Sequence, residues 1–136
     1  MKALILIIFL FIGANAIASD DVPLKSIPSI EEVSWALESS RWDIEESIYF
    51  SFEEVQDPSK MICSSKDKSE VISLFQIAFE RFSNYYPDEE LPYKKALKEL
   101  NKYLDGKVLD YCYSEIDGEK ILQVYYNSKF LVSIGQ

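Results

Sequence analysis

The chain has 136 residues, a length that allows one domain and argues against two. Its residues are 48% hydrophobic and 14% aromatic with only four glycines, which excludes a disordered or low-complexity chain. The formal net charge is −9. Phosphate backbones and anionic lipids should therefore repel the chain, and we expect no nucleic-acid binding.

Residues 1–18 have the organisation of a cleaved secretory signal peptide. Lys2 supplies the positive start, an apolar run covers residues 3–13, and small residues precede an expected cleavage after Ala18. The run is shorter than a membrane-spanning helix requires, so we expect no stable membrane anchor after cleavage. Removal of Lys2 takes the formal charge from −9 to −10. A periplasmic or secreted location is predicted.

The chain has two cysteines, Cys63 and Cys112. In an oxidising compartment an even pair predicts one disulfide. This bridge would close a loop of about 50 residues, which is worth roughly 4 kcal/mol in the chain-entropy model.

Residues 19–28 predict an extended lead-in, and residues 29–136 predict a single α+β domain. Ser29 is a good N-cap for a helix whose apolar stripe recurs at helical spacing as far as Val55. One helix over residues 30–55 would satisfy this stripe. However, residues 48–52 also alternate in the manner of a strand, so helix and strand both stay open over residues 46–56.

Two more helices are expected before the character of the chain changes. One covers residues 67–85, and the other runs from Pro92 to Leu104, where Asp105 and Gly106 end it. Three strands then follow over residues 108–116, 119–126 and 130–134. The predicted architecture is α+β: about three N-terminal helices packed on a C-terminal three-stranded antiparallel β-meander, with one disulfide.

The turn between the first two of these strands predicts their register. Asp117 and Gly118 form a strong hairpin signal, and a two-residue loop places Glu115 opposite Lys120. Extending this register assigns residues to two faces. We expect the core face to carry Cys112, Ile116, Ile121, Tyr125, Phe130, Val132 and Ile134. The opposite face would carry Leu109, Tyr111, Tyr113, Glu115, Lys120, Leu122, Val124, Tyr126, Lys129 and Leu131. The tyrosines of this second face are typical of a protein interface, although packing under a helix would also explain them.

The first predicted helix offers a second candidate surface. Trp35, Trp42 and Tyr49 are spaced by seven residues and would form one line on a helix. Glutamates at positions 31, 38, 46 and 53 would lie beside this line. Such a face could contact a basic protein or stack on sugar rings, whereas core packing would bury at least one tryptophan.

Catalytic equipment is missing from the sequence. The chain has no histidine, which excludes a Ser-His-Asp triad, a Cys-His pair and a histidine metal site. No glycine-rich phosphate loop or EF-hand loop occurs. Adjacent glutamates such as Glu45 and Glu46 are typical of a solvated helix face. We therefore expect no enzyme, no metal and no cofactor.

This profile predicts a protein that works by binding. The leading hypothesis is an exported periplasmic inhibitor or immunity protein that occludes the active site of a basic toxin or hydrolase. The predicted partner-binding residues are Trp35, Trp42, Glu38, Glu46, Tyr111, Tyr113, Glu115 and Tyr126. A glycan-binding or peptidoglycan-binding module is the first alternative, and a structural subunit of an envelope assembly is the second. A homodimer is compatible with each of them.

Overall fold

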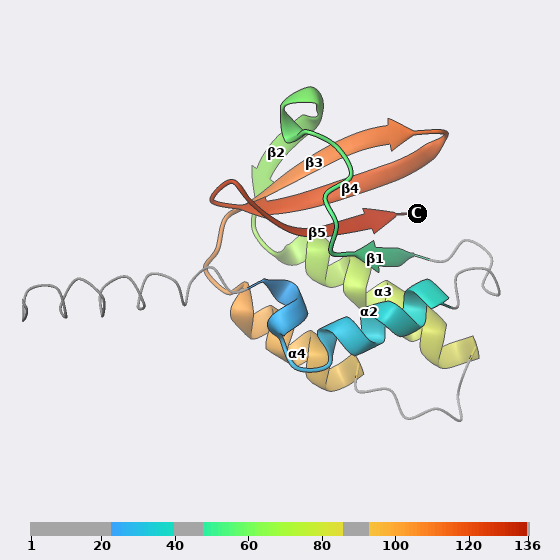
Figure 1. The fold of residues 1–136 in the computed structure, drawn as a ribbon. Coiled ribbons are helices and arrows are strands. Elements are labelled where there is room, and N and C mark those ends of the chain that lie inside the picture. The colour runs from blue at the N-terminus through green and yellow to red at the C-terminus, as the bar shows by residue number, and fades with distance from the viewer. Residues whose placement is uncertain (1–22, 40–47, 86–92, 136) are drawn as a thin grey trace, which may run out of the picture.

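The computed structural model describes residues 23–39, 48–85 and 93–135 (Figure 1). These residues form two layers, in which three helices lie against one face of a five-stranded antiparallel sheet. The helices are α2 (Ile30–Ser39), α3 (Ser69–Tyr85) and α4 (Tyr93–Tyr103). The predicted α+β class with a C-terminal meander is confirmed.

The sheet has two more strands than the sequence predicts. Its strand order is β1-β5-β4-β3-β2, so the meander β3-β4-β5 forms the centre and the two added strands form the edges. The strands are β1 (Tyr49–Ser51), β2 (Ile62–Lys66), β3 (Leu109–Ile116), β4 (Glu119–Tyr126) and β5 (Lys129–Gly135). Two single turns of 3₁₀ helix, η2 (Leu24–Ser26) and η3 (Pro58–Lys60), complete the elements.

Both hairpins of the meander have the predicted two-residue turns. Asp117 and Gly118 have φ angles of 53° and 81°, and Asn127 and Ser128 have φ angles of 50° and 64°. Positive φ at both central residues gives the turn twist that matches twisted antiparallel strands. Glu115 pairs with Lys120 as predicted.

The predicted assignment of the sheet faces is wrong. The hydrophobic core lies between the helices and the face that carries Tyr111, Leu122 and Val124, whereas Cys112 lies on the opposite face. A β-bulge at Val124 and Tyr125 also changes the register, because Val124 pairs with Val132 while Tyr125 pairs with Phe130. Because of the extra residue in β5, Val132 and Ile134 lie in the core as predicted, but they share that face with Tyr111 and Leu122 and not with Cys112.

A hydrogen bond to the start of α3 explains how a tyrosine can occupy the core. Tyr111 is 0% exposed, and its hydroxyl donates to the carbonyl oxygen of Asp67 at 2.5 Å. The backbone N–H of Val71 donates to the same hydroxyl at 3.5 Å. Since its polar atom is satisfied by backbone groups, the ring can pack fully against the helices.

The single helix predicted over residues 30–55 is also wrong. Helix α2 covers Ile30–Ser39, and Tyr49–Ser51 form strand β1, as the alternative interpretation expected. Phe50 is buried and stacks on Phe75 of α3, with ring centroids 3.8 Å apart. Pairing with β5 and this stacking both depend on residues far away in the sequence. They therefore override the helical spacing seen locally.

Helices α3 and α4 match their predicted positions within two residues at either end. The carboxylate of Asp67 accepts a hydrogen bond from the backbone N–H of Ser69 at 3.0 Å, which caps the first turn of α3. After α4, Gly106 has a φ of 74°, and Lys107 donates its backbone N–H to the carbonyl oxygen of Leu104. This left-handed glycine ends the helix in the predicted manner.

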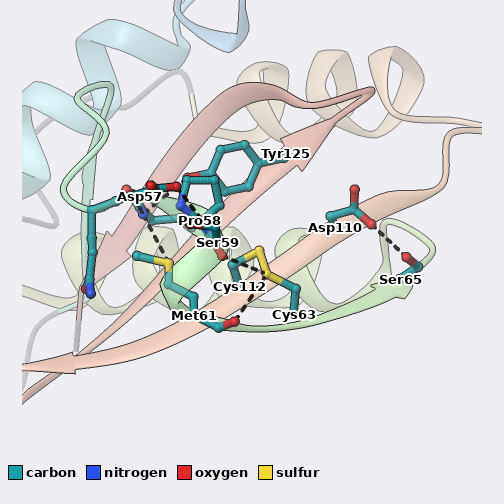
Figure 2. The surroundings of a disulfide bond; sticks show 11 residues. Asp57, Pro58, Ser59, Met61, Cys63, Ser65, Asp110, Cys112 and Tyr125 are labelled. Atoms are coloured by element: carbon teal, nitrogen blue, oxygen red, sulfur yellow. Dashed lines mark hydrogen bonds between the residues drawn. A yellow bond between two sulfur atoms is a disulfide. The ribbon is translucent and has the colours of Figure 1, made fainter.

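The disulfide between Cys63 and Cys112 is confirmed and lies on the sheet face opposite the helices (Figure 2). The two cysteines face each other directly across β2 and β3, with Cα atoms 4.0 Å apart. Figure 2 shows the turn at Pro58 and Ser59 close to the bridge and to Tyr125. This bond is consistent with an extracytoplasmic location, where disulfides persist.

The segment between β1 and β2 crosses this same outer face and is held by Gln123. The Gln123 side chain is fully buried. Its Oε1 accepts from the backbone N–H of Val55 at 2.6 Å, and its Nε2 donates to the carbonyl oxygen of Gln56 at 3.1 Å. One glutamine therefore replaces the strand partners that this irregular segment lacks.

Across the three described ranges, no helix has both the length and the hydropathy needed to cross a membrane.

Candidate functional site

An acidic groove runs between α2 and the edge strand β1. Its volume is about 280 Å³. One wall is a single stripe of α2, in which residues three and four apart share a face. The other wall is β1 with the two residues after it. The lining residues are Glu31, Ser34, Trp35, Glu38, Phe50, Ser51, Phe52 and Glu53.

Trp35 dominates the rim of the acidic groove. Its side chain is 70% exposed, although a tryptophan ring gains a large apolar stabilisation when it is buried. Glu31 and Glu38 lie one turn before and one turn after it, and Glu53 comes from the opposite wall. The described lining of this groove contains three carboxylates and no lysine or arginine. A large exposed ring among carboxylates suits contact with a cationic partner.

Ser34 lies beneath this rim and has an unsatisfied polar atom. The residue is 3% exposed, and its Oγ atom has no hydrogen-bond partner among the described residues. Leaving a buried hydroxyl without a partner costs about 1 to 3 kcal/mol. Ser34 is therefore a polar group of the groove that a ligand could satisfy.

A second hollow, the hairpin groove, lies between the β3-β4 hairpin and the first half of α3. Its volume is about 560 Å³, and its floor includes Leu74, Leu122 and Ile134. Ile62 and Tyr113, which are partners in register across β2 and β3, are 83% and 41% exposed. The remaining lining residues are Glu70, Ser114, Glu115 and Lys120.

The hairpin groove carries polar groups of both charge signs, and some of them have partners within the chain. The Tyr113 hydroxyl donates to Glu70 Oε1, and Glu115 lies directly opposite Lys120. Glu70 Oε2 lies 3.9 Å from the Lys66 ammonium and accepts no hydrogen bond from the described residues. Because a lysine lies among its carboxylates, the hairpin groove has less preference for a cationic ligand than the acidic groove has.

The structure divides the predicted partner-binding residues between several places. Trp35 and Glu38 lie together in the acidic groove, and Tyr113 and Glu115 lie together in the hairpin groove. Tyr111 is buried in the core and offers no surface to a partner.

The other predicted residues lie apart from both grooves or outside the described ranges. Tyr126 is partly buried, and the Lys107 ammonium lies 5.4 Å from the centroid of its ring. Trp42 and Glu46 lie outside the described residues. The predicted line of Trp35, Trp42 and Tyr49 along one helix does not form, because Tyr49 lies on β1.

Sequence reasoning missed Ser34 and Ile62. Nothing in the sequence marks the serine, because the burial of one polar residue depends on the strand that packs beside it. The position of Ile62, in contrast, could have been inferred from the expected disulfide. If the two cysteines face each other across neighbouring antiparallel strands, Ile62 must lie opposite Tyr113.

Metal binding finds no support among residues 23–39, 48–85 and 93–135, where no three histidine, cysteine, aspartate or glutamate side chains converge. The carboxylates of the acidic groove are therefore spread along its walls, unlike the ligands around a single ion.

No protein-family model, curated protein sequence or solved structure matches this chain. The functional interpretation therefore depends on the chemistry of the two grooves.

Proposed function

We propose that this chain is an exported, periplasmic binding protein that neutralises a basic toxin or hydrolase by occluding its active site. The observation that carries the proposal is the acidic groove, where an exposed tryptophan lies among three carboxylates. In this proposal the protein performs no chemistry of its own.

The groove has the two properties that a tight inhibitor of a basic enzyme needs. Its carboxylates, together with the net charge of −9, attract a basic cleft and increase the association rate. The Trp35 ring supplies an anchor whose burial slows dissociation. The carboxylates and the Trp35 ring can act without movement of the fold, because α2 is fixed to the core by Ile30, Val33 and Leu37.

The test starts with the full chain as the cell exports it, immobilised and exposed to envelope and secreted fractions. A hydrolase or toxin that is retained is then purified, and its activity is titrated with the chain. We expect inhibition to be complete at one chain per enzyme molecule and to weaken as the salt concentration increases. A retained enzyme whose activity the chain leaves unchanged would contradict the proposal.

Matched variants place the contact on the acidic groove. We expect Trp35→Ala to weaken inhibition by about 30-fold or more, as is usual for a tryptophan anchor. Val108→Ala is the control, since Val108 is also exposed but lies outside the groove. For charge, Glu38→Gln should slow association, whereas Glu80→Gln on α3 removes the same charge from outside the groove.

A glycan-binding module is a second candidate, because an exposed tryptophan beside carboxylates also suits a sugar ring. Cell-wall glycan fragments would then change the fluorescence of Trp35 with little dependence on salt. A Trp42→Phe background makes Trp35 the sole tryptophan of the chain. Strong salt dependence with no response to glycans would favour the protein partner.

A further inference from the structure

We propose that the acidic groove is an arginine pocket, which receives one arginine side chain of the partner. This inference rests on the proposed function, because it names the group that a basic partner would insert. Four observations carry it: the size of the groove, its spread carboxylates, the unpartnered hydroxyl of Ser34, and the exposed ring at its rim.

The size of the groove fits one side chain. Its volume of about 280 Å³ lies just below the range of roughly 300 to 1,000 Å³ that is usual for sites of drug-sized ligands. A helix or a folded element of the partner would not enter it. A single extended side chain could lie along the wall that α2 presents.

The lining offers acceptors that are spread apart, which suits a planar cation with many donors. A guanidinium carries five N–H donors in a fixed fork and no acceptor. Glu31, Glu38 and Glu53 offer carboxylate oxygens from both walls. A compact ion is a poorer match, because no three acidic groups converge here or elsewhere in the described part of the chain.

Ser34 supplies the independent sign of a ligand. Its side chain is 97% buried, lines the groove and leaves its Oγ without a partner in the described structure. Rotation about the Cα–Cβ bond carries a serine hydroxyl from one staggered position to another, so Oγ can turn toward an occupant. A guanidinium N–H would satisfy this oxygen as an acceptor.

Trp35 completes the recognition by stacking. A guanidinium lies flat on an indole ring and interacts with its negative face, and arginine does so more often than lysine. The exposed ring needs no rearrangement to accept it. The lining of the acidic groove therefore favours a partner that presents an arginine, and it disfavours a neutral residue of the same shape.

The test uses small probes on the full exported chain in the Trp42→Phe background. Three blocked tripeptides, Gly-Arg-Gly, Gly-Lys-Gly and Gly-citrulline-Gly, are titrated while the Trp35 fluorescence and indole N–H shift are recorded. We expect saturable binding of the arginine peptide, about tenfold weaker binding of the lysine peptide, and none of citrulline, which keeps the shape but loses the charge.

Variants assign the contacts. Glu38→Gln and Ser34→Ala should each weaken binding of the arginine peptide by about five- to tenfold. Glu38→Gln should leave the melting temperature unchanged, and Ser34→Ala should raise it, because the variant loses an unpartnered buried hydroxyl. Glu80→Gln and Ser73→Ala are the matched controls on α3 and should change nothing.

Failure of the pocket is distinguishable from failure of the proposed function. If the arginine and lysine peptides bind equally, or the Trp35 signals do not saturate, the arginine pocket is wrong even where Trp35→Ala abolishes enzyme inhibition. If the arginine peptide binds as expected while the purified enzyme is not inhibited, the pocket stands and the proposed function fails.

Discussion

The ring of Tyr49 lies directly over the α-carbon of Gly135, its partner in register across β1 and β5. A Cβ atom placed on Gly135 would clash with Cζ of Tyr49. From this position the Tyr49 hydroxyl donates to Glu119 Oε2 at 3.0 Å. The tyrosine thus reaches across β5 and ties the edge strand to β4, which requires glycine at position 135.

We expect Gly135→Ala to destabilise the fold by about 1 to 2 kcal/mol, because the added methyl displaces the ring and breaks its hydrogen bond to Glu119. Urea denaturation measures the change in the free energy of unfolding. In a Tyr49→Ala background the same substitution should cost much less. An equal cost in both backgrounds would mean that the ring is not the obstacle.

The buried amide of Gln123 gives a second prediction. Gln123→Met keeps the approximate shape but removes the acceptor of the Val55 N–H and the donor to the Gln56 carbonyl. We expect a loss of about 1 to 3 kcal/mol, since a buried hydrogen-bonded group loses its partner. Hydrogen exchange should also show much faster exchange at Val55. Unchanged exchange there would contradict the described role of Gln123, and Ser65→Ala serves as a control at an exposed outer-face hydrogen bond.

Removal of the disulfide should reduce stability more than either of these changes. A bridge that closes a loop of this length contributes roughly 4 kcal/mol in the chain-entropy model, and Cys63 and Cys112 are 49 residues apart. We expect the double variant Cys63→Ala, Cys112→Ala to melt well below the oxidised chain. Reductant should lower the melting temperature of the natural chain and leave the variant unchanged.

Two buried tyrosines make stability sensitive to alkaline pH. Burial raises the pKa of Tyr111 to about 12, and burial together with the charge of Glu54 raises the pKa of Tyr125 to about 12. In the unfolded chain these hydroxyls lose their protons near pH 10. The two protonated tyrosines therefore contribute their full share of the free energy of unfolding below pH 10, and this share is lost as the pH rises from 10 to 12. The loss is on the order of 2 to 3 kcal/mol for each tyrosine.

Urea denaturation between pH 9 and pH 12 measures this loss. In Tyr111→Phe the free energy of unfolding should decline less steeply with pH, because the variant has one buried hydroxyl less to ionise. Tyr113→Phe is the control, since it removes a hydroxyl from a ring of the same face that is partly exposed. An identical decline in Tyr111→Phe and the natural chain would show that Tyr111 does not ionise on unfolding.

The sequence predicted the elements whose signals are local. The Asp117–Gly118 turn fixes its own backbone conformation, and so the pairing of Glu115 with Lys120 followed from a few neighbouring residues. Trp35 and Glu38 lie within one short helix, so their shared face could also be predicted.

Long-range contacts decided the features that the sequence could not predict. Strand β1 exists because Phe50 packs on Phe75 and pairs with a strand more than 80 residues later. The core face of β3 and β4 was misassigned because the face that carries Cys112 was taken as the core, whereas the disulfide lies on the outer face (Figure 2) and Tyr111 fills the core with its hydroxyl bonded to backbone. The bulge in β5, which no residue type marks, changes only the alternation within that strand. The acidic groove needed β1 beside α2, which the expected continuous helix would have excluded.

The position of the disulfide determines which proteolytic cleavages would break the chain into separate fragments. Helices α3 and α4 both lie inside the covalent loop between Cys63 and Cys112. A single peptide-bond cleavage within that loop would leave both pieces in one covalent molecule. The nicked chain would retain its mass apart from one added water, and it would separate into fragments only after reduction. Outside the loop, by contrast, a cut between α2 and β1 would release the helix that bears Trp35 from covalent attachment to the sheet.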